Sequence, residues 1–295
     1  MKQFLAIVFA LAFVAGVSAQ NTVSLEGADE TVYLWDNTTA KHSNHETRDE
    51  AWRKGKKNSV QCTSSCELYI FKADPEKNTG AAILMYPGGG YTYLNFAVPT
   101  ARWYASLGIT AVLVKYRLPN YGHYQATIED AAGAVRYMRT RTDLGIDPTK
   151  VGVSGSSAGG HLAAWVSNAM ADDEKPAFAI LHFPWINLTK CVTNTEGKAM
   201  FQLLGKNYCY QDALNLSVNN MVSSTTPPTL LMLCNDDNVV PSVSSTSYYK
   251  ALTQHGVKAS LHIYPKGGHS LKNHTKEYKT AIIDWLDWLK ITAND

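Results

Sequence analysis

The five residues 155–159 read Gly-Ser-Ser-Ala-Gly, so that two glycines stand two positions before and after a central serine. The run before them is typical of a loop that enters a short β-branched strand, and the run after them is typical of an apolar-faced helix. A strand that turns sharply through a serine into a helix exposes the serine hydroxyl, and the glycines let the strand and helix pack closely. Only Ser157 has glycine at that spacing on both sides, whereas Ser156 does not. We therefore predict that Ser157 is a nucleophile.

A serine hydroxyl needs a base before it becomes an effective nucleophile. Near the C-terminus, an apolar strand ends in a Gly-Gly turn that is followed by His269. Upstream, a continuous apolar strand ends close to two adjacent acids, Asp236 and Asp237. A buried carboxylate can fix the imidazole tautomer and stabilise the imidazolium that forms during the reaction. The chain order is therefore serine, acid, histidine, which differs from the orders in chymotrypsin and subtilisin.

A run of three glycines supplies the remaining catalytic component. Residues 81–86 are typical of a buried strand, and Gly88, Gly89 and Gly90 follow it. Successive glycines let backbone N–H groups approach a substrate oxygen, and each such donor stabilises a transition state by roughly 3–4 kcal/mol. A second donor is expected from the N–H of Ala158, directly after the nucleophile. A phosphate loop is a weaker interpretation, because no Gly-Lys-Ser/Thr follows the glycines. We predict an oxyanion hole built from Gly89, Gly90 and Ala158.

With these motifs the chain resembles the α/β-hydrolase esterases, and among them the carbohydrate acetyl esterases of the acetyl xylan esterase type. The resemblance runs from about residue 67 to the C-terminus, and it is carried by residues 86–91, 114–119, 145–148, 154–162, 237–241 and 267–269. In the family pattern the catalytic Asp precedes x-Val-Val-Pro, which corresponds to Asp237 and not to Asp236. Pro87 replaces a His of lipase-like relatives, and Ser270 replaces a Gly that often follows the catalytic His. Neither departure removes a catalytic group.

The pattern of elements predicts the same α/β class. Strand-like runs lie near 67–72, 81–86, 109–115, 150–154, 177–183, 229–234 and 258–264, and helical patterns lie near 96–107, 124–140, 157–170, 242–255 and 274–290. This alternation favours a mostly parallel twisted sheet with helices on both faces, which is the α/β-hydrolase fold that the resemblance implies. We divide the chain into an N-terminal arm at 20–66 and a catalytic domain at 67–295. A polar segment at 186–226 interrupts this domain as a lid-like insertion.

The first residues predict export from the cytoplasm. A positive start at Lys2, an apolar run over 4–17 and a small residue at Ala19 describe a secretory signal peptide at 1–19. The apolar run is short for a membrane anchor, and no other stretch could span a bilayer. We therefore expect a secreted or periplasmic protein without a membrane span after cleavage.

Five cysteines would then meet an oxidising compartment. Cys62 and Cys66 flank a short turn, and Cys191 and Cys209 bracket a polar segment, so these two pairs are the expected disulfides, although the sequence alone cannot fix a pairing. Cys234 ends an apolar strand and is expected to be a buried free thiol. A zinc site is the weaker alternative, because no paired Cys-x-x-Cys or Cys/His spacing occurs.

The leading hypothesis is a secreted serine esterase that removes acetyl or other short acyl groups from plant polysaccharides through an acyl-enzyme, with no metal or organic cofactor. Tyr91, Tyr93 and Trp185 follow strands at the carboxyl edge of the sheet and are candidates for the substrate pocket. A formal net charge of +2 on 295 residues gives no reason to expect a nucleic-acid partner. The alternatives are a feruloyl esterase or general carboxylesterase and, from a different class, a catalytically inactive relative used for binding.

Overall fold

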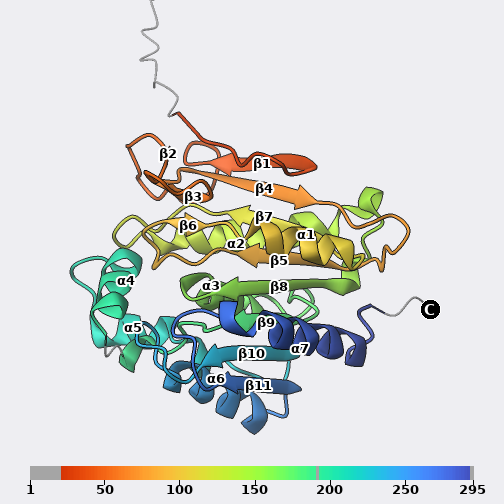
Figure 1. The fold of residues 1–295 in the computed structure, drawn as a ribbon. Coiled ribbons are helices and arrows are strands. Elements are labelled where there is room, and N and C mark those ends of the chain that lie inside the picture. The colour runs from red at the N-terminus through yellow and green to blue at the C-terminus, as the bar shows by residue number, and fades with distance from the viewer. Residues whose placement is uncertain (1–20, 191–192, 293–295) are drawn as a thin grey trace, which may run out of the picture.

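A computed structural model describes residues 21–190 and 193–292 of the chain. Its large sheet contains, in chain order, β1 (Glu30–Asp36), β4 (Ser65–Phe71), β5 (Ala82–Tyr86), β7 (Thr110–Lys115), β8 (Val151–Ser156), β9 (Ala179–His182), β10 (Thr229–Cys234) and β11 (Ala259–Tyr264). The strands lie in the spatial order β1-β4-β7-β5-β8-β9-β10-β11, which Figure 1 shows from top to bottom. β4 pairs antiparallel with β1 and with β7, and all pairs from β7 to β11 are parallel.

Helices cover both faces of this sheet. α2 (Tyr124–Arg139), α3 (Ala158–Ala169) and α6 (Val243–Gln254) pack on one face, where α2 contacts α3 and the Tyr248 hydroxyl of α6 accepts a hydrogen bond from Asn168 of α3. α1 (Val98–Ser106) and α7 (Thr275–Trp288) lie together on the other face, with the Lys279 ammonium 4.7 Å from the ring centre of Trp103. The sheet therefore has one core layer on each side.

The central strands form because their residues are apolar on both sides. Every residue of β5, β7 and β10 is buried, and such continuous apolar runs are typical of parallel strands covered by helices. The seven strand-like runs and five helical patterns of the sequence each correspond to one of these elements, to within about three residues at either end. The predicted fold class, a mostly parallel α/β-hydrolase sheet with helices on both faces, is confirmed.

The segment that we expected to be an N-terminal arm takes part in regular structure. β1 lies at the edge of the large sheet, and β2 (Ala51–Trp52) and β3 (Ser59–Gln61) form a small sheet with β6 (Leu94–Asn95). β1 exposes alternate residues over its first half, and β2 and β3 have only two and three residues. β2 and β3 are too short to show a period, whereas β1 does carry alternation and β-branched and aromatic residues, a signal that the division into an arm overlooked.

A buried charge cluster ties this N-terminal segment to the sheet. The Lys115 ammonium at the end of β7 donates to Glu50 Oε2 (2.7 Å), to Glu67 Oε1 (2.6 Å) and to the Val23 carbonyl (3.2 Å). The side chain of Lys115 has no exposed surface, and neither has that of Glu50. The three donors of the ammonium thus meet three acceptors, two of which come from the N-terminal segment.

The insertion at 186–226 contains α4 (Asn194–Leu204) and α5 (Tyr210–Leu216). α4 begins with a capping box in which the Thr193 hydroxyl accepts from the Glu196 N–H while the Glu196 carboxylate accepts from the Thr193 N–H. In Figure 1 the arrowheads of β5, β8 and β10 point to the side on which α4 and α5 lie, so the insertion stands at the carboxyl edge of the sheet. Among the described residues, none of the helices is both long and apolar enough to cross a bilayer.

The cysteines follow the prediction only in part. Cys62 and Cys66 are free thiols, so the expected disulfide between them is wrong. Cys66 lies inside β4 with its side chain in the core, whereas Cys62 precedes the strand with a left-handed φ of 60°. Because the chain between them is extended, the two side chains do not meet in the geometry that a disulfide requires. Cys191 lies outside the described residues, so its pairing with Cys209 stays a prediction. The predicted signal peptide at 1–19 also lies outside them. Cys234 is buried and free, as expected.

Candidate active site

Ser157 occupies the sharp turn between β8 and α3. Its φ of 56° and ψ of −122° are strained for a residue with a side chain, and the strain is held by the elements on both sides. A Cβ placed on Gly155 would lie 2.1 Å from the carbonyl oxygen of Gly159, and one placed on Gly159 would lie 2.0 Å from that of Tyr86. The two glycines of the frame are therefore required by close backbone contacts, and the serine is left at the head of the helix.

His269 and Asp237 meet at the ends of β11 and β10. The imidazole Nδ1 lies 2.7 Å from Asp237 Oδ2, and Asp237 Oδ1 accepts hydrogen bonds from the N–H groups of Val239 (2.9 Å) and Val240 (3.0 Å). The Asp237 side chain is fully buried, whereas that of His269 is 20% exposed. A carboxylate held by two backbone donors and one imidazole is suited to orient that imidazole.

The neighbouring acid has another role in the structure. Asp236 Oδ1 accepts from the N–H groups of Gly267 (2.9 Å) and Gly268 (2.8 Å), so that it fixes the turn before His269. These backbone hydrogen bonds lower the pKa of the Asp236 carboxyl. Two adjacent acids thus serve two tasks, because one binds the imidazole and the other binds the loop that carries it.

Ser157 and His269 line one cleft, which we call the serine cleft and which has a volume of about 330 Å³. Gly89, Gly90 and Ala158 also line it, and in the described part of the chain their N–H groups donate no hydrogen bond to the protein. Free N–H donors beside a nucleophile are what an oxyanion requires. No hydrogen bond joins Ser157 Oγ to a side chain among the described residues. Catalytic hydrogen bonds of this kind often tighten only when substrate binds.

The three aromatic residues predicted for the substrate pocket do not share one position. Tyr93 and Trp185 line the serine cleft, and the Arg53 guanidinium stacks 3.6 Å from the centre of the Tyr93 ring. Tyr91 does not line this cleft, because its side chain is 1% exposed and lies within the core. The left-handed φ of 55° at Tyr91 explains the difference, since it turns the side chain away from the direction that follows from strand geometry alone.

Tyr91 instead joins the glycine loop to the nucleophile helix. Its hydroxyl lies 2.6 Å from His161 Nδ1, and His161 Nε2 lies 2.8 Å from the Leu216 carbonyl oxygen. A carbonyl can only accept, so Nε2 carries the proton and Nδ1 accepts from Tyr91. Burial lowers the pKa of His161 to about 4, which keeps the ring neutral. These hydrogen bonds link the glycine loop, the nucleophile helix α3 and the end of α5.

Sequence reasoning missed several residues of the cleft. Phe183 follows β9 directly with a left-handed φ of 37°, and its ring centre lies 4.5 Å from that of His269. Thr195 and Glu196 reach the cleft from α4. The position of Phe183 at a strand end was a usable signal, but nothing in the sequence shows which turn of α4 faces the serine.

A sequence pattern for the alpha/beta hydrolase fold matches residues 83–273, which is more than half of the chain. The chain belongs to the α/β-hydrolase family. Over 227 residues this α/β-hydrolase is 34% identical to an acetylxylan esterase of Xylanibacter ruminicola, a match that covers 73% of this chain and 46% of the relative. It is 25% identical to endo-1,4-beta-xylanase B of Butyrivibrio fibrisolvens, over 71% of this chain and 35% of that protein. The chain thus spans less than half the length of these two curated relatives.

Solved structures also resemble this α/β-hydrolase. An acetyl ester-xyloside bifunctional hydrolase from Caldicellulosiruptor lactoaceticus superposes with a TM-score of 0.72 at 31% identity, covering 89% of this chain and 97% of the other. A carboxylesterase from Lactobacillus plantarum superposes with a TM-score of 0.69 at 19% identity, over 90% and 99% of the two chains, and this likeness concerns the fold alone.

Proposed function

We propose that this α/β-hydrolase is a serine esterase that removes acetyl groups from plant polysaccharides or their oligosaccharides through an acyl-enzyme. One observation carries the proposal: the nucleophile candidate Ser157, His269 and three unpaired backbone N–H groups line one cleft, and Asp237 is hydrogen-bonded to that His269. The relatives named for acetylxylan and acetyl ester-xyloside substrates support the carbohydrate ester as substrate.

The chemistry follows from the positions of these groups. Ser157 Oγ attacks the ester carbonyl carbon while its proton passes to His269 Nε2, and the carbonyl electrons move to the oxygen beside the free N–H groups. When the tetrahedral intermediate collapses, the bond to the sugar oxygen breaks and His269 returns the proton to that oxygen. Water, deprotonated by the same imidazole, then cleaves the acetyl-serine, and acetate leaves. In this scheme Asp237 stabilises the imidazolium in both halves of the reaction.

The walls of the serine cleft support a sugar as the alcohol part of the ester. Tyr93 offers partly exposed aromatic surface, whereas Trp185 lines the cleft with only 2% of its surface exposed. Thr195 and Glu196 add polar residues to the same lining. This combination suits the apolar faces and hydroxyl edges of a sugar ring. The predicted signal peptide at 1–19 supports action outside the cytoplasm, where such polysaccharides occur.

A substrate panel tests the proposal. The wild-type protein should hydrolyse p-nitrophenyl acetate and release acetate from acetylated xylo-oligosaccharides faster than it cleaves methyl ferulate. Ser157→Ala should lower kcat by on the order of 10⁶, which leaves only binding and oxyanion effects. Ser156→Ala is the matched control and should keep most of the activity on p-nitrophenyl acetate, which carries no sugar. A preference for methyl ferulate would favour a feruloyl esterase, and absence of hydrolysis in the folded wild type would favour a binding protein.

A further inference from the structure

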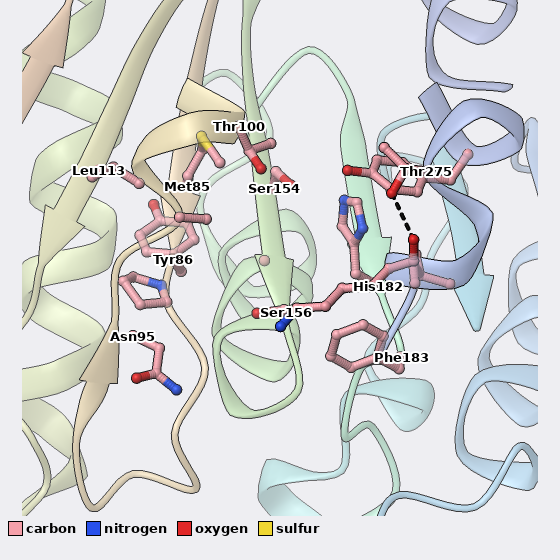
Figure 2. Close-up of a pocket in the computed structure, with 16 residues that line it drawn as sticks. Met85, Tyr86, Asn95, Thr100, Leu113, Ser154, Ser156, His182, Phe183 and Thr275 are labelled. Atoms are coloured by element: carbon pink, nitrogen blue, oxygen red, sulfur yellow. Dashed lines mark hydrogen bonds between the residues drawn. The ribbon is translucent and has the colours of Figure 1, made fainter. Parts of the chain in front are cut away.

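A second compartment adjoins the serine cleft on the side of the sheet that carries α1 and α7. This α1–α7 compartment has a volume of about 270 Å³, and its floor consists of residues from β5, β7, β8 and β9. Figure 2 shows it from within, with Met85, Leu113, Ser154 and His182 around it. Asn95, Ser156, Phe183 and Lys272 line both spaces, so the two are continuous beside the nucleophile.

Three polar side chains on the floor have no partner. Ser154 and Ser156 project from β8 and His182 from the end of β9, as Figure 2 shows, and none of the three side chains hydrogen-bonds to another described residue. Ser154 is only 3% exposed, and burial lowers the pKa of His182 to about 4, so that the imidazole is neutral with one donor and one acceptor. Ser156 and His182 are half-buried, and no polar atom of the three side chains is fully enclosed by protein, so each can hydrogen-bond to a ligand in the compartment.

The remaining lining is mixed, with Thr100, Lys272 and Thr275 among apolar side chains. Leu113 and Met85 lie on the floor, Tyr278 comes from α7, and the ring of Phe183 stands between this compartment and His269. An acetyl group would leave most of the volume empty. A longer alkyl chain would leave the hydroxyls and the imidazole unpaired. A pyranose ring satisfies both demands, since it has apolar C–H faces and a rim of hydroxyls that donate and accept.

We propose that the α1–α7 compartment is a second sugar subsite, which holds a pyranose ring next to the one whose acetyl ester lies at Ser157. Ser154, Ser156 and His182 hydrogen-bond the hydroxyls of this ring, and Asn95 stands at the mouth. This inference rests on the proposed function, and it adds that the enzyme selects oligosaccharide esters over single acetylated sugars. The second pyranose ring contributes to substrate binding without touching the reacting atoms.

The test compares acetylated xylobiose with p-nitrophenyl acetate as substrates. His182→Phe keeps the ring shape but removes both nitrogens, and Ser154→Ala removes one hydroxyl without adding volume. The measured quantity is the ratio of kcat/KM for acetylated xylobiose to kcat/KM for p-nitrophenyl acetate. We expect each change to lower this ratio about tenfold, mainly by raising KM for the sugar ester, because each removes one hydrogen bond in a buried site. Ala97→Leu, at an exposed position on the mouth, should lower the ratio as well. His262→Phe on β11 is the control and should leave it unchanged, because His262 pairs with Ser260 away from both spaces.

The outcomes separate this proposal from the one it rests on. If the wild type releases acetate from acetylated xylobiose, but the ratio stays within twofold of wild type in Ser154→Ala and in folded His182→Phe, the subsite is refuted and the esterase function stands. If the wild type cleaves p-nitrophenyl acetate but no acetylated sugar, the proposed function fails. If these variants instead change the preference between acetyl and hexanoyl nitrophenyl esters, the compartment holds the acyl chain and the sugar subsite is refuted.

Discussion

Replacing Asp237 by Asn should inactivate the enzyme by forcing His269 into the wrong tautomer. Two backbone N–H groups, from Val239 and Val240, point at Asp237 Oδ1. In the variant the amide oxygen must occupy that place, because the opposite orientation would lose two hydrogen bonds of about 1 kcal/mol each. The amide NH₂ then faces His269 Nδ1, which has to accept, so the ring proton moves to Nε2. An Nε2 that carries a proton cannot take one from Ser157.

The expected loss in kcat is about 10⁴, or roughly 5.5 kcal/mol of transition-state stabilisation. The assay is hydrolysis of p-nitrophenyl acetate, with circular dichroism to establish folding and imidazole ¹⁵N shifts to report the tautomer. Asp236→Asn is the control, since an Asn oxygen can still accept from Gly267 and Gly268, and it should lose less than tenfold. Comparable losses in two folded variants, or a tautomer unchanged in Asp237→Asn, would refute the reasoning.

Three further expectations concern acyl length, the loop clamp and pH. The kcat/KM for nitrophenyl esters should fall steeply from acetyl to butyryl to octanoyl, whereas an open apolar groove would gain about 0.8 kcal/mol per buried methylene and make it rise. Tyr91→Phe leaves His161 Nδ1 without its donor, so it should destabilise the fold by about 1–3 kcal/mol in urea unfolding and lower kcat with little change in KM. Because the folded pKa of His161 is about 4 and the ordinary value is 6.5, the unfolded chain binds the proton first, and His161 alone should lower stability by about 3 kcal/mol as pH drops from 6.5 to 4. Urea titrations of wild type and His161→Gln at several pH values in that range check this, since the free energy of unfolding of the variant should change less with pH.

The sequence predicted those features that local pattern determines. Buried parallel strands are continuous apolar runs, and the turn at Ser157 needs glycines at fixed spacing, so both can be read from neighbouring residues. The site of Asp237 followed from the family pattern, and the structure places that carboxylate against His269. Whether these residues form a working triad stays a prediction for the assays above.

Other features depend on contacts between distant segments. Tyr91 lies next to the glycines, but its burial follows from a left-handed turn and from His161, seventy positions further along the chain. The α1–α7 compartment joins residues of five strands and two helices, and no spacing in the sequence brings Ser154 and His182 together. The free thiols of Cys62 and Cys66 likewise reflect the path of β4 and not the short distance between them in sequence.

The lysine at the end of β7 has a consequence for how the chain is made. An ammonium in the core without partners costs several kcal/mol, so β7 cannot settle in the sheet before acceptors surround Lys115. Val23, Glu50 and Glu67 all precede Lys115 in the chain and leave the ribosome before it. During synthesis, the Lys115 ammonium therefore appears only after the three residues that accept its hydrogen bonds have been made. The segment before residue 67 supplies two of the three acceptors, so removing it would leave this buried ammonium short of partners in the folded sheet.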